Sequence, residues 1–426
     1  MDITAREAAR SALREYRRGA ELKAAVEKRL TALSDARERA LAKQIAYGTA
    51  RNTALCDYYI ASASKLGLSR LAPPILDILR AAVYQMAFLG KTPAFAVVNE
   101  AAEAARRAAG ARAAGFVNAV LRRLAGDGFP EVRAESAAER LAILYSHPVR
   151  LVRELTAQLG EERAEAELEA NNKEPPVYAR ANTLKITGEG LLARLRGEGI
   201  DARPGGQPAI IELHGAGEVA SLGAFREGLF FAQDPSSARA ALALGAGPGD
   251  IVVDACAAPG GKSFAAAMDM ENKGRIIAFD TPGRTRFISD GARRLGIDII
   301  ETRARDAAEP IPELEGKADA VIADVPCSGF GVIRKKPDIR FKTDADTAGL
   351  PEAQLGILLA CSSYVKPGGT LVYSTCTWMR RENDGVVEAF SELRGGAFEL
   401  EGKTSLYAHS DGGDGFFYAV FRRKAL

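Results

Sequence analysis

Residues 251–270 read IVVDACAAPGGKSFAAAMDM. A β-branched run, a turn with two adjacent glycines and an alanine-rich stretch follow one another, which predicts a strand, a tight turn and a helix. Further apolar runs follow at intervals that leave room for a helix between them: RIIAFD (275–280), IDIIET (297–302), ADAVIADV (318–325) and TLVYST (370–375). This alternation predicts an α/β domain, with a parallel sheet covered by helices on both faces. The tail GFFYAVFRRK (415–424) predicts one added strand near an edge.

The rest of the chain has a different texture. From residue 5 to about 125 the pattern is helical nearly everywhere, and one apolar face follows the i, i+3, i+4, i+7 spacing at Ile75, Ile78, Leu79, Ala82, Val83 and Met86. Residues 146–231 give mixed signals, including a short strand at AIIEL (209–213). We therefore divide the chain into an all-α domain (1–140), a small α+β linking region (146–235) and the α/β domain (236–426).

The composition excludes several classes of protein. Hydrophobic residues make up 47% and charged residues 26%, and the net charge is +2, which are ordinary globular values. No uncharged run reaches the roughly 18 residues that a membrane helix needs, so we expect a cytoplasmic protein with no membrane partner. The five cysteines are scattered without a Cys-x-x-Cys pair, and the three histidines have no neighbouring ligand, so we expect neither disulfides nor a metal site.

The glycine loop CAAPGGK (256–262) raises the question of its ligand. A nucleoside triphosphate loop needs glycine where Cys256 stands, and the dinucleotide pattern Gly-x-Gly-x-x-Gly is not spelled. S-adenosylmethionine is a third choice, because it needs a close backbone and a carboxylate for its ribose at the next strand end. Asp280 stands there, and Asp306 after the third strand is placed to accept from the adenine amino group. Each aspartate alone is as readily explained as a helix cap.

Two cysteines follow strands of the expected sheet. Cys327 and Cys376 come at the same rim as the glycine loop, whereas Cys56 and Cys361 fall in helical patterns and are expected to be core fillers. A thiolate that adds to C6 of a pyrimidine turns C5 into a carbon nucleophile that can take a methyl group. A base must then remove the C5 proton, and a group near N3, for which Asp324 is close in sequence, must stabilise the adduct. Spacing alone does not rank the two thiols.

At this point the chain shows a family resemblance. DACAAPGGKS (254–263), DVPCSGFGVIRKKPDIRF (324–341) and YSTCT (373–377) resemble the signature motifs of the NOL1/NOP2/Sun family of RNA cytosine-C5 methyltransferases. The stretches IAYGTARN (45–52), ILRAAVYQMAFLGKTPAFAVVNEA (78–101) and AAGFVNAVLRRL (113–124) resemble the NusB-like helical domain of the branch that acts on bacterial 16S rRNA. EPPVYARANTLK (174–185) and GLFFAQDPSS (228–237) are similar to its linking region, so the likeness covers nearly the whole chain.

The resemblance implies a fold and a set of roles. The fold is a Rossmann-like S-adenosylmethionine-dependent methyltransferase domain behind an N-terminal NusB-like domain and a small α+β linker. Cys376 is implied to be the nucleophile that attacks C6, and Cys327 to help release the product. The residues implied to hold S-adenosylmethionine are Cys256, Ala257, Ala258, Pro259, Gly260, Gly261, Lys262, Asp280 (ribose), Asp306 (adenine) and Asp324 (methionine end and reacting base).

The sequence departs from the family pattern at two places. TPGRTRF (281–287) is one residue shorter than the usual run, which leaves open whether Arg284 or Arg286 contacts the cofactor. Val149 stands where an aromatic residue is frequent. Neither change touches the residues that carry the chemistry.

A basic stretch follows Cys327. GVIRKKPDIRFK (331–342) holds five basic residues and one acid, and we expect RNA phosphate contacts from Arg334, Lys335, Lys336, Arg340 and Lys342, with a solvated loop as the alternative. Arg122 and Arg123 offer a second contact. A paired cytosine must be flipped out to reach a thiol, so we expect the substrate to be single-stranded or still-unfolded 16S rRNA, before subunit assembly. We also expect the protein to be a monomer.

The sequence is also compatible with two other functions. The same chemistry could act on a transfer RNA or on 23S rRNA, because the motifs specify the reaction and the accessory domain selects the RNA. The chain could also be a non-catalytic RNA-binding assembly factor. A pure binder has no need of both thiols, which argues against the assembly factor.

Overall fold

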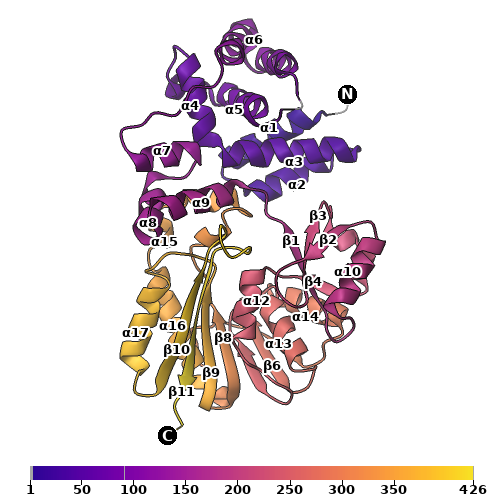
Figure 1. Ribbon diagram of the computed structural model, residues 1–426, viewed down its shortest axis with the longest axis vertical. Helices are drawn as coiled ribbons and strands as arrows, with labels where there is room; N and C mark the ends of the chain where they lie inside the picture. The colour runs from indigo at the N-terminus through magenta and orange to yellow at the C-terminus, as the bar shows by residue number, and fades with distance from the viewer. Residues whose placement is uncertain (1–2, 91, 426) are drawn as a thin grey trace. The chain divides into compact units, whose positions relative to one another are not determined.

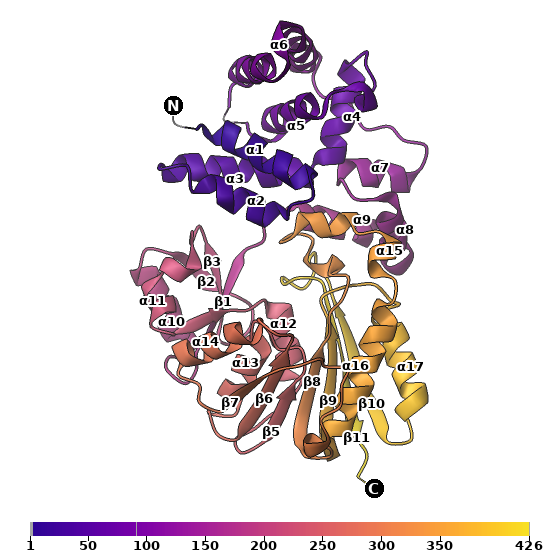
Figure 2. The ribbon, with the colours of Figure 1, turned by 180° about the vertical axis from the view of Figure 1, so that it is seen from behind.

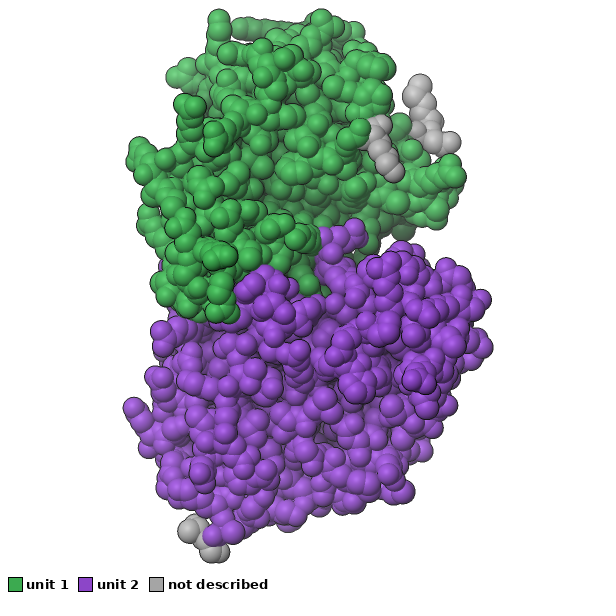
Figure 3. All heavy atoms as spheres, viewed as in Figure 1, with its two compact units in different colours: residues 1–173, 333–341 green, residues 174–332, 342–426 purple. Residues whose placement is uncertain are grey.

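The computed structural model describes residues 3–90 and 92–425. The chain forms two compact units, which Figure 3 distinguishes by colour. Unit 1 consists of Met1–Lys173 together with Ile333–Phe341, and unit 2 consists of Glu174–Val332 and Lys342–Leu426. Unit 1 is therefore built from two separate pieces of chain. Each unit is described by itself below.

Unit 1 is helical. Its core joins α4, α5 and α6 through buried side chains such as Ile60, Leu79, Val97 and Leu121. The helix α6 is interrupted at Gly110, where φ is 82°, so it consists of two helices that meet at a sharp bend. The elements are α1 (Ala5–Arg17), α2 (Leu22–Leu30), α3 (Ala36–Arg51), α4 (Thr53–Ala63), η1 (Leu68–Arg70), α5 (Pro73–Phe88), α6 (Ala94–Asp127), α7 (Ala137–Leu144), α8 (Val149–Leu159), α9 (Glu161–Asn172) and η5 (Pro337–Phe341).

Unit 2 begins with a small antiparallel sheet in the order β2-β3-β1-β4. Its strands are β1 (Val177–Ala181), β2 (Asp201–Pro204), β3 (Ile210–His214) and β4 (Phe230–Ala232). The short helical elements beside it are α10 (Gly188–Gly197), η2 (Val219–Ser221) and α11 (Gly223–Arg226). Leu191 and Leu195 of α10 are buried in one cluster with Ala179 and Leu213 of the sheet. The strand expected at AIIEL corresponds to β3.

The larger sheet of unit 2 has seven strands in the order β10-β11-β9-β8-β5-β6-β7. All five expected strand runs are present and parallel, and β11, from the tail, is antiparallel to β9. The strands are β5 (Ile251–Asp254), β6 (Arg275–Asp280), β7 (Ile300–Ala304), β8 (Ala318–Asp324), β9 (Val365–Thr375), β10 (Phe398–Leu406) and β11 (Phe416–Arg423). The chain runs outward from β5 through β6 to β7, then returns to β8 on the other side of β5. The topological switch point therefore lies between β5 and β8.

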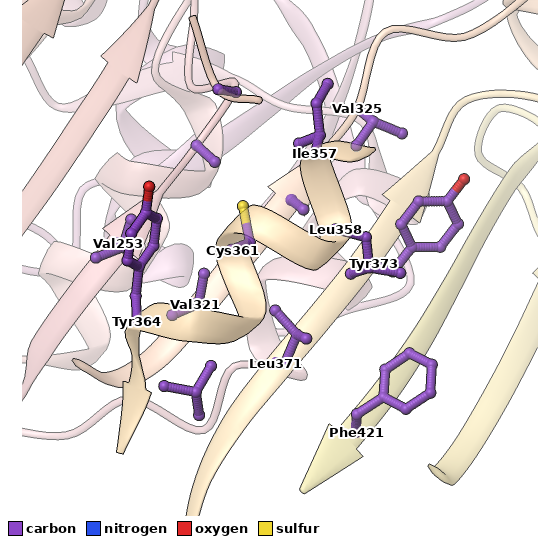
Figure 4. Close-up of a cluster of buried hydrophobic side chains, with 14 of the residues drawn as sticks. Val253, Val321, Val325, Ile357, Leu358, Cys361, Tyr364, Leu371, Tyr373 and Phe421 are labelled. Atoms are coloured by element: carbon purple, nitrogen blue, oxygen red, sulfur yellow. The ribbon is translucent and has the colours of Figure 1, made fainter. Parts of the chain in front are cut away.

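Helices cover both faces of this sheet, as Figures 1 and 2 show. Successive side chains of a strand point to opposite faces, so Val252 packs towards α13 and α14 while Val253 packs towards α16 and α17. Figure 4 shows the second face, with Leu358 and Cys361 of α16 beside the strand residue Val321. The remaining elements of the unit are α12 (Pro235–Leu242), α13 (Gly261–Asp269), α14 (Thr285–Leu295), η3 (Pro312–Leu314), η4 (Phe330–Val332), α15 (Asp344–Thr347), α16 (Leu350–Tyr364) and α17 (Asp384–Arg394).

The architecture confirms the predicted fold class: a doubly wound, largely parallel sheet, a helical N-terminal part and a small α+β part between them. Cys56 and Cys361 are buried core residues, as expected. Over residues 3–90 and 92–425, no helix combines the length and the apolar character required to cross a bilayer.

Candidate active site

The carboxyl ends of four neighbouring parallel strands, β9, β8, β5 and β6, meet at one edge of the large sheet. In open α/β sheets, ligands bind at this edge next to the switch point. The glycine loop follows β5, and the two predicted cysteines follow β8 and β9. The topology therefore brings the predicted catalytic and cofactor residues to one place.

The glycine loop turns sharply into the N-terminus of α13. Gly260 has φ 115°, which an L side chain rarely adopts, and a Cβ there would lie 2.3 Å from the ring of Phe264. The Asp280 carboxylate at the end of β6 supports the loop, because Oδ2 accepts the N–H of Ala258 at 2.8 Å. Its Oδ1 accepts the N–H of Thr281 at 2.8 Å. Asp280 thus fixes the backbone of the loop and retains lone pairs for a further donor.

Asp254, the last residue of β5, lies beneath the loop. Its Oδ2 accepts from the hydroxyl of Ser263 at 2.7 Å, while its buried Oδ1 has no hydrogen-bond partner among the described residues. Burial raises the pKa of Asp254 to about 6. An unpartnered buried acceptor at this position is available to a donor on a ligand.

A polar chain crosses the edge from the glycine loop to β9. The Nζ of Lys262 lies 2.5 Å from Oδ2 of Asp324, and the hydroxyl of Ser374 donates to Oδ1 of the same carboxylate at 2.7 Å. The Lys262 side chain is only 10% exposed. The carboxylate of Asp324 is therefore fixed from both sides, with an ammonium group on one of them.

The two predicted cysteines lie in direct contact, with 3.3 Å between their Sγ atoms. The hydrogen bond from Cys327 lowers the pKa of Cys376, whereas the same bond together with burial raises the pKa of Cys327. The hydrogen bond between the two thiols therefore favours a thiolate on Cys376 over one on Cys327.

Three further contacts hold the two cysteine loops together. The hydroxyls of Ser328 and Thr377 are 2.8 Å apart, and the N–H of Gly331 donates to the carbonyl of Cys376 at 3.0 Å. The indole of Trp378 donates to the carbonyl of Phe330 at 3.0 Å. A Cβ at Gly331 would lie 1.9 Å from the carbonyl oxygen of Gly415, so only glycine fits there.

The remaining predicted cofactor residues surround the same edge. Cys256 is half-buried, and burial raises the pKa of its thiol, which makes it an unreactive member of the loop. Asp306 is exposed after β7, and its Oδ1 accepts the N–H of Ala308 at 2.9 Å. Of the two arginines left open, Arg284 donates to the carbonyl of Ala258 at 3.2 Å. Arg286 instead stacks over the ring of Phe287.

The basic segment gives a different outcome for Arg340. This side chain is 0% exposed, and its Nη1 donates to the carbonyls of Arg51 at 3.1 Å and Ser146 at 2.9 Å. Its Nη2 donates to Oδ1 of Asn172 at 3.0 Å. Burial lowers the pKa of Arg340 to about 9. The expected phosphate contact by Arg340 is at odds with this placement, because the guanidinium group is occupied inside unit 1 by carbonyls at the ends of its helices.

The other basic residues divide into inward and outward groups. Arg334 is buried, and Lys342 donates from Nζ to the carbonyl of Ser328 at 2.8 Å, so it supports the loop that carries Cys327. Lys335 and Lys336 are exposed. Arg122 and Arg123 are exposed near the end of α6, where Arg123 pairs with Asp127 at 3.4 Å. Lys335 and Lys336 therefore remain the best candidates for phosphate contacts in this segment.

Sequence reasoning missed three residues of the site. Ser374 lies inside the YSTCT motif but was not given a role, although its strand-end position places it beside Asp324. Glu382 and Gln354 are fully buried beside the Cys327 loop. Nothing in the sequence marks them, because a charged residue before a helix and a glutamine within one are ordinary surface features.

The donor and acceptor set fits S-adenosylmethionine. Acceptors for ribose hydroxyls are present on Asp280, and the orphaned Oδ1 of Asp254 offers an acceptor under the loop. The backbone around Gly260 and Gly261 permits a close approach. The loop does not match a triphosphate loop, because Cys256 stands where that loop opens with glycine.

Comparison with known proteins identifies all three parts. Residues 241–422 match the model of the 16S rRNA methyltransferase RsmB/F, residues 3–126 match the NusB family, and residues 147–220 match the ferredoxin-like domain of RsmF/B-like methyltransferases. A relative described as a probable ribosomal RNA small subunit methyltransferase B from Bacillus subtilis is 36% identical over 416 residues, 92% of each chain. The ribosomal RNA small subunit methyltransferase B of Xanthomonas campestris is 32% identical and covers 97% of this chain and 95% of its own. The crystal structure of PH0851 superposes with a TM-score of 0.81 at 27% identity, over 98% of each chain.

Proposed function

The chain belongs to the RsmB/F family of 16S rRNA methyltransferases, and from this premise we propose that it transfers a methyl group from S-adenosylmethionine to C5 of a specific cytosine in 16S rRNA. The reaction proceeds through a covalent bond between Cys376 and C6 of the base. The observation that carries the proposal is the pair of thiols 3.3 Å apart at the strand edge that also holds Asp324. Methylation of a nitrogen or an oxygen atom would need neither thiol.

The roles of the side chains follow from their surroundings. Cys376, whose pKa is lowered by the hydrogen bond from Cys327, adds to C6. Asp324, held by Lys262 and Ser374, stabilises the adduct through a hydrogen bond near N3 of the ring. Cys327 acts in product release, either beside the base that takes the C5 proton or, after it has given its own proton to solvent, as that base. Cys376 is then eliminated.

The cofactor is held by the loop after β5. S-adenosylmethionine supplies a methyl group activated by its sulfonium centre. The loop 256–262 binds it through backbone groups, Asp280 accepts from the ribose hydroxyls and Asp306 accepts from the adenine amino group. Arg284, which contacts both Asp280 and the carbonyl of Ala258, holds this side of the loop in place.

The RNA must present an unpaired cytosine, because a base inside a duplex cannot reach a thiol. We place the reaction in the cytoplasm, on 16S rRNA before the subunit is assembled. Lys335 and Lys336 are exposed in the segment that follows the Cys327 loop, where they can hold phosphates.

The test is bisulfite sequencing of RNA from a deletion strain. One cytosine of 16S rRNA should lose its protection, and a plasmid copy of the gene should restore it. A plasmid copy carrying Cys376→Ala should not restore it, whereas Cys361→Ala, a matched change in the core, should. A lost site in transfer RNA or 23S rRNA would redirect the substrate, and no lost site in any RNA would leave only an assembly factor.

A second test addresses the covalent step. Cys327→Ala should accumulate a protein–RNA adduct that survives a denaturing gel, because Cys376 still attacks but the product is not released. The double variant Cys327→Ala/Cys376→Ala should form none. Absence of the adduct from the single variant would contradict the release role of Cys327.

A further inference from the structure

Glu382 is a buried carboxylate between the catalytic strand β9 and helix α17. It lies six residues after Cys376 and is 0% exposed. Its Oε2 accepts the N–H of Ser328 at 2.8 Å and Nε2 of Gln354 at 3.0 Å. Its Oε1 has no hydrogen-bond partner, and no ion pair involves Glu382, within residues 3–90 and 92–425. A buried carboxylate without a cation is costly, so its retention calls for an explanation.

The contacts of Glu382 surround Cys327. Ser328 follows Cys327 directly, and the Gln354 amide that donates to Glu382 also donates to the carbonyl of Pro326, which precedes Cys327, at 3.0 Å. The hydroxyl of Tyr373 donates to the backbone carbonyl of Glu382 at 2.5 Å. Glu382 therefore holds the backbone after Cys327 directly, and the backbone before Cys327 through Gln354.

The charges around the two thiols are unequal. The hydrogen bond to Cys376 and burial raise the pKa of Cys327, and the Glu382 carboxylate raises it further. The hydrogen bond from Cys327 lowers the pKa of Cys376 against the opposing effect of burial.

Three other charged groups face Cys376: the carboxylates of Asp324 and Asp414 raise its pKa, and the Lys262 ammonium lowers it. The Asp324 carboxylate, which outweighs the Lys262 ammonium at Cys376, is itself paired with that ammonium at 2.5 Å, whereas the Glu382 carboxylate on the side of Cys327 has no cationic partner among the described residues.

We propose that Glu382 is a positioning residue that gives the two thiols their separate roles. It holds Cys327 against Cys376 and keeps the shared proton on Cys327, which leaves the sulfur of Cys376 as the nucleophile. A glutamine would satisfy the same two donors but would carry no charge, so the charge itself is the property that matters. The inference deepens the proposed function and rests on it for the separate tasks of the two thiols.

The test uses Glu382→Gln in the full-length protein, without RNA or cofactor. Both variant and unaltered protein are treated with limiting iodoacetamide between pH 6 and 9, and the alkylated cysteines are identified by peptide mass spectrometry. The unaltered protein should react at Cys376 before Cys327. In Glu382→Gln the ratio of Cys376 to Cys327 labelling should fall by about tenfold for each pKa unit of lost bias.

Glu388→Gln is the matched control, since Glu388 is exposed on the following helix α17 and loses the same charge. It should leave the labelling ratio unchanged. An unchanged ratio in Glu382→Gln would overturn the inference. Glu382→Asp keeps the charge and should therefore keep the preferential labelling of Cys376. If Glu382→Asp loses this preference, the inference is overturned, even if Glu382→Gln does not fold.

The outcome is separable from that of the proposed function. Labelling measures the thiols alone, so an unchanged ratio would refute the role of Glu382 and leave methyl transfer untouched. Failure to find a methylated cytosine in 16S rRNA would refute the function and leave the labelling result standing. In turnover, Glu382→Gln should lower kcat with little change in the KM for RNA, because Glu382 acts on the thiols and touches neither substrate.

Discussion

The edge of the large sheet and the basic segment Ile333–Phe341 were both singled out by sequence motifs, yet only the first behaves as its motifs predict. At the edge, Lys262, Asp280, Asp324 and the two cysteines converge. In the segment, Arg340 turns inward while Lys335 and Lys336 stay exposed. The difference lies in what fixes a side chain: parallel strands end at a common edge, whereas a segment without strand or α-helix periodicity leaves the direction of each side chain to its local packing.

The largest effect is expected from the edge. Cys376→Ala should lower kcat by at least about 10³-fold, because it removes the proposed nucleophile on which the other groups act. The affinity for S-adenosylmethionine, measured by isothermal titration calorimetry, should stay within a few-fold. Cys361→Ala provides the control and should remain active. Near-normal turnover by the Cys376→Ala protein would show that another group is the nucleophile.

Replacement of Arg340, the buried arginine of the basic segment, should lower the stability of unit 1. Arg340→Met leaves several buried acceptors, among them the carbonyls of Arg51 and Ser146, without a donor, which should cost about 3 kcal/mol in the free energy of unfolding of unit 1. Denaturant unfolding followed by circular dichroism measures this. Lys336→Met, an exposed change in the same segment, should stay within about 0.5 kcal/mol. Equal stabilities for the two variants would show that the burial of Arg340 is unimportant.

A smaller effect is expected at the cofactor side of the edge. Asp280→Asn removes a charge-assisted hydrogen bond to the glycine loop and the proposed acceptor for the ribose, so the affinity for S-adenosylmethionine should fall about 10- to 100-fold. Calorimetry checks this against Asp290→Asn, an exposed aspartate of α14 that should bind normally. Unaltered binding by Asp280→Asn would remove Asp280 from the proposed cofactor contacts.

The smallest effect belongs to the outward lysines. Lys335→Ala/Lys336→Ala should weaken RNA binding only a few-fold and reduce the slope of log K against log salt by about 0.7 per lysine for a single-stranded RNA. Filter binding at several salt concentrations measures both quantities. The double change Lys23→Ala/Lys28→Ala on α2 keeps the number of lost charges the same and should leave the slope unchanged. An unaltered slope in the first variant would mean that this segment makes no phosphate contact.

Much of the fold could be predicted because its pattern is local. The apolar runs that became β5 to β9 are short, β-branched and separated by helices, and this pattern has few alternatives. Strand β10 was missed, because its sequence FELEGKTSL is mostly polar and exposed at the outer edge of the sheet. Its pairing with β11 depends on a tertiary neighbour that no local pattern announces.

The site was predictable where a residue ends a strand and was hidden where it does not. Cys327 and Cys376 could be placed at one rim from the sequence, but the direct contact between their sulfur atoms depends on the tertiary structure. Glu382 and Gln354 act through contacts between segments far apart in the sequence, so their burial could not be anticipated. Arg340 was wrongly expected at the surface, because a run of basic residues predicts exposure. Its burial depends on carbonyl groups from other segments, such as that of Ser146.

Unit 1 is completed by the segment Ile333–Phe341, which is synthesised late. Its first 173 residues are synthesised well before Ile333–Phe341, and at about 5–20 residues per second the 159 residues between the two pieces correspond to roughly 8–32 s. During that interval the carbonyls that will receive Arg340 stay hydrated, and the helices around them lack their final closure. A fragment cut after Lys173 would lack the hydrogen bonds from Arg340, so it should be less stable than unit 1 in the full-length protein.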